Sequence, residues 1–147
     1  MAARRKKSSK RSATKPTERL EAPLICIVDE CLGRYAVPEA LRAAGVHVIL
    51  HHELFPAGTD DEAWLRSLAG RLDAVVLTKD SRIRKRVIER QALAAARLRV
   101  FALSAGNLSG EHQAAAFVRA LPKIRRLAKK VGPFIARVTA TGAVDRT

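Results

Sequence analysis

The sequence predicts an α/β domain, with a mainly parallel β-sheet covered by helices on both faces. Two observations lead to this fold class. Short apolar runs alternate four times with segments of helical periodicity, and the connections between them are short. The chain has 147 residues, of which 48% are hydrophobic. That length and apolar content fit one core and leave little room for a second domain.

The first part of the predicted sheet contains two strands and one helix. Residues 24–28 form a continuous apolar run rich in β-branched residues, which is typical of a buried strand. A helix is predicted from Gly33 to Ala44, ended by Gly45 at its C-cap. Residues 46–50 are the second strand. Residues 51–59 are expected to be a loop because they contain a proline and a glycine.

The middle of the chain repeats this alternation. Asp60 is predicted to cap a helix that ends near Gly70. Residues 74–78 form the third strand. A basic helix is then predicted from Ser81 to about Ala96, with Ser81 as its cap.

The last part of the chain supplies a fourth strand from Leu98 to Leu103. A long helix from Gly110 to Lys130 follows, and Pro122 should kink it. Residues 134–144 are predicted as a terminal hairpin with its turn at Thr141-Gly142.

Charge and composition narrow the range of possible partners and functions. The formal net charge is +14 and the sequence pI is about 11.0, which favours a polyanionic partner such as nucleic acid. Residues 1–22 are expected to be a disordered basic tail ahead of a domain spanning residues 23–147. With no secretory signal, no apolar run of membrane length and two cysteines outside any CxxC pattern, we expect a cytoplasmic protein.

Acidic residues lie at the carboxyl ends of two predicted strands. Asp29 and Glu30 follow residues 24–28, and Asp80 comes shortly after the third strand. Because the carboxyl ends of parallel strands share one edge of a sheet, these carboxylates are expected to converge on one cleft. Several carboxylates together can hold one or two hydrated Mg²⁺ ions, whereas a single one binds weakly. The pattern predicts a metal-dependent nuclease site that faces a polyanion.

A third acidic group, Asp60-Asp61-Glu62, opens the helical pattern between these strands. Its first member is expected to be a cap, and either of the other two could point from the first turn toward the cleft. Lys and Arg residues flank the proposed cleft, and two polar residues follow the fourth strand. The residues expected to contact the substrate are Arg34, Lys79, Arg82, Arg84, Ser104 and Asn107.

Each signal also has a structural interpretation. Asp29 could be an ordinary helix N-cap, Asp80 a turn residue, and the basic segment 82–90 a solvated helix face. The four histidines lack clear metal-ligand spacing. The nuclease interpretation depends on three acidic sites that lie on one predicted edge of one sheet.

These residues resemble the PIN-like domains, specifically the compact ones found as toxin components of VapBC-type toxin–antitoxin pairs. The resemblance covers residues 24–138. It implies a three-layer α/β/α fold whose mainly parallel sheet has four or five strands. The matching segments are Ile27-Val28-Asp29-Glu30-Cys31-Leu32-Gly33-Arg34, residues 37–45, Thr59-Asp60-Asp61-Glu62-Ala63-Trp64, Val76-Leu77-Thr78-Lys79-Asp80-Ser81-Arg82-Ile83-Arg84 and residues 100–108.

The resemblance also implies an activity. It points to a metal-dependent endoribonuclease that uses Mg²⁺ or Mn²⁺ and is neutralised by an antitoxin covering the cleft. Carried onto this chain, the first-strand and third-strand carboxylates and one intervening acid hold the metal. These catalytic and metal-binding residues are Asp29, Asp61 and Asp80, with Glu30 and Glu62 as further candidate ligands.

One position departs from the family pattern. Many members place a fourth acid after the fourth strand, where this chain has Ser104 and Asn107 and no carboxylate. Either residue could orient a phosphate or a metal-bound water. The expected partners are RNA and a cognate antitoxin protein, with a homodimer left open and no membrane.

Two other functions are compatible with parts of the sequence. A non-catalytic RNA-binding module would use the basic tail and segment 82–90, with structural carboxylates. A receiver-like phosphoacceptor domain would pair Asp29-Glu30 with Asp80, Ser104 and Lys123. The receiver pattern fails because a basic run follows Asp80 and no strand precedes Lys123.

Overall fold

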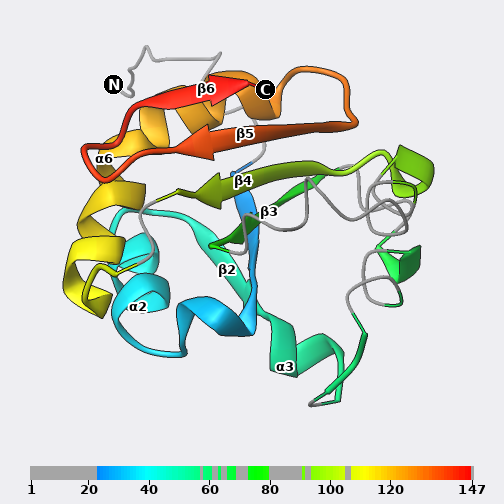
Figure 1. The fold of residues 1–147 in the computed structure, drawn as a ribbon, viewed down its shortest axis with the longest axis horizontal. Coiled ribbons are helices and arrows are strands. Elements are labelled where there is room, and N and C mark those ends of the chain that lie inside the picture. The colour runs from blue at the N-terminus through cyan, green and yellow to red at the C-terminus, as the bar shows by residue number, and fades with distance from the viewer. Residues whose placement is uncertain are drawn as a thin grey trace, which may run out of the picture.

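The protein is described from a computed structural model that covers residues 23–56, 58–60, 63, 66–68, 73–79, 91, 94–104 and 107–146. Within these ranges the chain forms one six-stranded sheet with helices packed against it (Figure 1). The predicted tail 1–22 and most of the predicted helix from Ser81 to Ala96 lie outside the described residues.

The sheet is mainly parallel, as predicted, and its strand order is β2-β1-β3-β4-β5-β6. Five strands run parallel to their neighbours, and only β6 is antiparallel, paired with β5. Six strands are one more than the upper end of the predicted number, because both strands of the terminal hairpin join the sheet. The bounds are β1 Ile25–Val28, β2 His47–Leu50, β3 Ala74–Thr78, β4 Arg99–Leu103, β5 Phe134–Val138 and β6 Val144–Arg146.

The central strands are buried on both faces, which explains their continuous apolar runs. Successive side chains of a strand point to opposite faces. In β1, Cys26 and Val28 therefore enter a larger core cluster, and Ile27 enters a smaller one. The smaller cluster is covered by Leu68 and Ala96, which lie in or beside short helical segments. The predicted α/β/α layering is thus confirmed.

Two helices cover the larger cluster, α2 (Ala36–Ala43) and α6 (Gly110–Ala128). They pack closely where small residues meet, since a Cβ added to Gly110 would lie 3.3 Å from Ala36 Cβ. The Ser109 side chain caps α6 by accepting a hydrogen bond from the backbone N–H of His112. The predicted long helix is confirmed, and its helical assignment continues through Pro122.

Two local elements differ from the prediction. A short 3-10 helix, η1 (Glu30–Leu32), ends at Gly33 with a φ of 80°, so the predicted helix from Gly33 begins only at Ala36. The predicted loop 51–59 starts instead with a helical turn, α3 (His51–Leu54). The Glu53 side chain stabilises this turn by accepting a 2.7 Å hydrogen bond from the backbone N–H of Leu50.

The terminal hairpin forms as predicted. Gly142 occupies its turn with a φ of 89°, a conformation that glycine adopts without steric cost. The Gly142 N–H donates to the Thr139 carbonyl at 2.9 Å, and the Thr139 N–H donates to the Ala143 carbonyl at the same distance.

A buried arginine ties the amino-terminal edge of the sheet together. Arg99, the first residue of β4, donates hydrogen bonds to the carbonyl oxygens of Ala128 at the end of α6 and of Ala74 at the start of β3. Burial lowers the pKa of its guanidinium, and the nearby Asp73 charge opposes that effect. Among the described residues, no helix is long and apolar enough to cross a membrane.

Candidate functional site

The carboxyl ends of β1, β3 and β4 lie side by side at one edge of the sheet (Figure 1). The register pairs Val28 with Leu77 and Thr78 with Ala102. Asp29, Lys79 and Ser104 therefore follow three adjacent strands at this edge, as the sequence predicted for the first and last of them.

Asp29 is the best-defined residue of this edge. It is 9% exposed, and its backbone N–H donates a 2.9 Å hydrogen bond to the Leu77 carbonyl. Its Oδ2 atom accepts a 2.7 Å hydrogen bond from the Thr78 hydroxyl and a 3.3 Å hydrogen bond from the Cys31 thiol. Although Asp29 precedes η1, its side chain makes no capping hydrogen bond. Asp29 therefore occupies the N-cap position of η1, as the structural interpretation allowed, but its side chain is directed to Thr78 and Cys31 and does not cap the turn.

Cys31 connects the first strand end to the third. Its sulfur donates to Asp29, lies 3.4 Å from the Thr78 hydroxyl, and accepts a 3.4 Å hydrogen bond from the backbone N–H of Lys79. Burial, and next the negative charge of Asp29, raise the pKa of the Cys31 thiol to about 11. The thiol is therefore protonated at neutral pH and can donate to the carboxylate. Sequence reasoning assigned no role to Cys31 or Thr78, although both lie within the segments that resemble the PIN-like domains.

Glu30 faces a different neighbour. Its side chain is 49% exposed, and its Oε2 atom lies 4.0 Å from Nδ1 of the buried His51, the first residue of α3. The imidazole ring in turn packs at 5.2 Å from the ring of Phe55. Glu30 thus leans toward α3, whereas Asp29 is held against β3.

The expected substrate residues within the described ranges lie around this edge. Arg34 is exposed in the turn after η1, Lys79 is partly buried directly after β3, and Asn107 is exposed. Ser104 is bound to β5, because its N–H and its hydroxyl donate to the Val138 carbonyl at 2.8 and 3.2 Å. Its hydroxyl oxygen can still accept a hydrogen bond.

Several predicted site residues lie outside the described residues, namely Asp61, Glu62, Asp80, Arg82 and Arg84. Asp60, the expected cap, is exposed. Within the described ranges no three His, Cys, Asp or Glu side chains gather into a set that could hold a metal ion. The described part of the predicted metal site consists of the buried carboxylate of Asp29 and the half-exposed carboxylate of Glu30, and carboxylates are the class of ligand that hard cations prefer.

The sequence comparisons place this edge in a family context. The profile of the family described as "PIN like domain" matches residues 25–105, which is more than half of the chain and includes β1, β3 and β4. The chain belongs to the PIN-like domain family. A protein of Mycobacterium tuberculosis named "Putative ribonuclease VapC45" is 30% identical to it over 112 residues, covering 74% of this chain and 80% of that protein. No solved structure matches the chain significantly.

Family membership also removes the receiver-like alternative. In this PIN-like domain Lys123 is exposed within α6, not after a strand. The expected order of receiver residues is therefore absent from the carboxyl edge of the described sheet.

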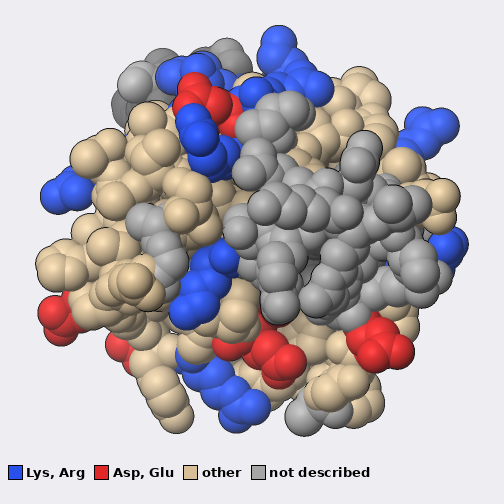
Figure 2. Space-filling view, in the orientation of Figure 1, with Lys and Arg blue, Asp and Glu red and all other residues tan. Residues whose placement is uncertain are grey.

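Charge is unevenly spread over the visible face of the PIN-like domain (Figure 2). Most acidic side chains on this face lie along its lower half, where α3 lies in Figure 1, whereas Lys and Arg side chains are scattered over the face, both at its rim and near its centre.

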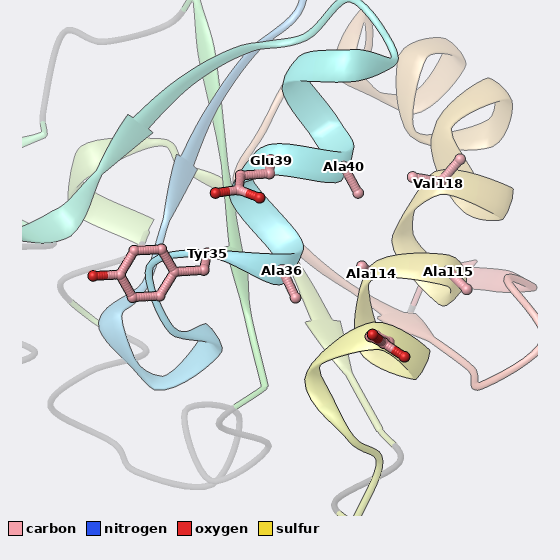
Figure 3. Close-up of a pocket in the computed structure, with 8 residues that line it drawn as sticks. Tyr35, Ala36, Glu39, Ala40, Ala114, Ala115 and Val118 are labelled. Carbon is pink, nitrogen blue, oxygen red and sulfur yellow. The ribbon is translucent and has the colours of Figure 1, made fainter.

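A shallow, mainly apolar groove lies between α2 and α6 (Figure 3). Alanines from both helices face each other along it, and Tyr35 projects from its end with 73% of its side chain exposed. The groove shares no lining residue with the Asp29–Cys31–Thr78 cluster. It is a feature of the helical layer and not part of the carboxylate site.

Proposed function

We propose that this PIN-like protein is a metal-dependent endoribonuclease, acting as the toxin component of a toxin–antitoxin pair. The observation that carries the proposal is the setting of Asp29. Its carboxylate is buried at the carboxyl end of β1, and two donors hold Oδ2. Such outer hydrogen bonds orient a metal-ligating carboxylate and leave its other oxygen to face an ion.

The proposed metal ligands are Asp29, Asp61 and Asp80, with Glu30 and Glu62 nearby in the sequence. Carboxylate oxygens suit Mg²⁺ and Mn²⁺. When bound, such an ion lowers the pKa of a water molecule and stabilises charge on the scissile phosphate. The contribution of Asp29 is to present one oxygen in a fixed direction, because Thr78 and Cys31 occupy the other.

The proposed substrate is RNA, held through its phosphates. Arg34 and Lys79 lie at the Asp29 edge within the described residues, and Arg82 and Arg84 follow closely in the sequence. Cations bind phosphates largely without regard to base sequence, so these residues supply affinity and position. Ser104 and Asn107, beyond β4, are proposed to contact a phosphate or a water where other family members carry a fourth acid.

The proposed protein partner is a cognate antitoxin that covers the cleft, and the proposed site of action is the cytoplasm. The name of the Mycobacterium tuberculosis relative, a putative ribonuclease of VapC type, supports the toxin assignment. In growing bacteria, induction of the wild-type chain should arrest growth and induction of Asp29→Asn should not. Equal arrest by both chains would contradict a catalytic toxin.

Cleavage of RNA tests the activity directly. The full-length protein is incubated with labelled single-stranded RNA in Mg²⁺, in Mn²⁺ and in EDTA, with an Asp29→Asn preparation purified in parallel as the control for contaminating nucleases. We expect cleavage with either metal, none in EDTA, and recovery when Mn²⁺ is added back. RNA binding without cleavage under every condition would favour the non-catalytic RNA-binding module instead.

A further inference from the structure

We propose that Cys31 is a positioning residue that couples Asp29 to the backbone leading into Asp80. The inference rests on the proposed function, since Asp29 is one proposed ligand and Lys79 directly precedes another, Asp80, in the sequence. It adds a residue that neither the sequence prediction nor the family comparison assigns to the site.

The coupling is a continuous chain of contacts. The backbone N–H of Lys79 donates to the Cys31 sulfur at 3.4 Å, and the Cys31 thiol donates to Asp29 Oδ2 at 3.3 Å. Lys79 is joined to Asp80 by one peptide bond. One sulfur atom therefore contacts both the carboxylate after β1 and the backbone after β3.

Two side chains donate to Asp29 Oδ2, and of these two only Cys31 also contacts the backbone N–H of Lys79. Thr78 binds the same Oδ2 atom, but it contacts Asp29 through its hydroxyl and does not hold the Lys79 N–H. Cys31 is brought to this point by η1, whose turn begins directly after Asp29. The 3-10 turn thus places the Cys31 thiol, which both donates and accepts a hydrogen bond, two residues after Asp29 and beside the carboxyl end of β3.

The side chain at position 31 must both donate and accept a hydrogen bond. A thiol does both, and so does the hydroxyl of serine, whereas alanine does neither. Outer-shell groups of this kind typically change metal affinity or activity by about 10- to 100-fold when removed. Cys31→Ala and Cys31→Ser therefore separate loss of the bridge from loss of the sulfur itself.

Metal binding provides the first test. The dissociation constant for Mn²⁺ is measured by the electron paramagnetic resonance signal of the free ion, in full-length wild type, Cys31→Ala, Cys31→Ser and Asp29→Asn. We expect Cys31→Ala to weaken Mn²⁺ binding by about tenfold and Cys31→Ser to restore it to within about threefold of wild type. In cleavage assays, Cys31→Ala should raise the Mn²⁺ requirement without changing the KM for RNA.

A second measurement does not depend on the metal. Amide hydrogen exchange at Lys79, followed by NMR in metal-free protein, should be faster in Cys31→Ala than in wild type and restored in Cys31→Ser. Cys26→Ala is the matched control, because it removes the other thiol of the same segment, a fully buried one that faces the larger core cluster. Its Mn²⁺ affinity and Lys79 exchange should equal those of wild type.

The outcomes separate the two proposals. Unchanged Mn²⁺ affinity and unchanged Lys79 exchange in folded Cys31→Ala would overturn the positioning role, whatever the activity of wild type. Wild type that binds no Mn²⁺ and cleaves no RNA would contradict the proposed function. In that case the Lys79 exchange rates alone decide whether Cys31 forms the bridge.

Discussion

The Thr78 hydroxyl donates a 2.7 Å hydrogen bond to Oδ2 of Asp29 from the end of the neighbouring strand, 49 residues away in the sequence. Both residues are buried. The parallel pairing of β1 with β3, with Val28 opposite Leu77, brings the two side chains to the same level. The contact fixes one oxygen of the carboxylate on which the proposed metal chemistry depends.

Replacing Thr78 should affect activity more than stability. Thr78→Val keeps the shape of the side chain but removes the donor, and loss of such an outer-shell group typically costs about 10- to 100-fold in metal affinity or activity. Thr78→Ser keeps the donor and should stay within about fivefold of wild type by the same reasoning. Rates of RNA cleavage at saturating Mn²⁺ and half-saturating Mn²⁺ distinguish the variants. Equal rates for Thr78→Val and wild type would remove the orienting role.

Arg99 should matter for stability and not for chemistry. Arg99→Ala leaves the carbonyl groups of Ala128 and Ala74 without their charged donor, which should lower the free energy of unfolding by about 2–4 kcal/mol. The residue begins β4, at the opposite edge of the sheet from Asp29. Urea denaturation measures the loss, and the cleavage rate of the folded fraction should stay at the wild-type value. A loss below about 0.5 kcal/mol would show that the fold does not depend on the two Arg99 hydrogen bonds.

Two glycines with the same φ of 89° provide a matched pair. A Cβ at Gly45 would meet nothing within 4 Å, whereas one at Gly142 would lie 2.5 Å from Arg119 Cβ. Gly45→Ala should cost about 1 kcal/mol from backbone strain alone, and Gly142→Ala should cost at least about 1 kcal/mol more from the clash. Thermal or urea unfolding compares them. Equal losses would indicate that the β5–β6 turn shifts away from α6 freely.

The two thiols should make the protein sensitive to alkali. Burial raises the pKa of Cys26 from 9.0 to about 12 and that of Cys31 from 9.0 to about 11. The folded state then binds more protons than the unfolded state above about pH 9, so this part of the stability is complete below that pH and is lost as pH rises toward the folded values. Unfolding free energies at about pH 8 and about pH 10.5 test this. The fall should be smaller in Cys31→Ser, and an equal fall would assign it to other groups.

Much of the fold could be predicted because its strands are buried on both faces. The continuous apolar runs of β1, β3 and β4 identify them without tertiary information. Helix α6 and the hairpin turn could be predicted in the same way, because a long amphipathic pattern and a glycine at the turn are local features of the sequence. Helix α3 was missed because it is stabilised by one hydrogen bond, from the Leu50 N–H to the Glu53 side chain. A single glutamate after a strand is not a distinctive sequence signal.

The candidate site was predicted only in part. Asp29 could be found because a carboxylate directly after a buried strand is visible in the sequence. Thr78 and Cys31 could not, because their role depends on the register that sets β3 beside β1. Asp61 and Asp80 stay predictions, since both lie outside the described residues.

The most direct measurement for the central claim is the single-turnover rate of RNA cleavage by Asp29→Asn at saturating Mn²⁺. The amide is nearly the same size as the carboxylate and can still accept from Thr78, so the fold should persist, as circular dichroism would verify. We expect a fall of at least about 100-fold, the loss typical of removing one preorganised catalytic group, with the Kd for RNA changed less than about threefold. A rate equal to that of wild type would contradict a metal-dependent ribonuclease site at Asp29.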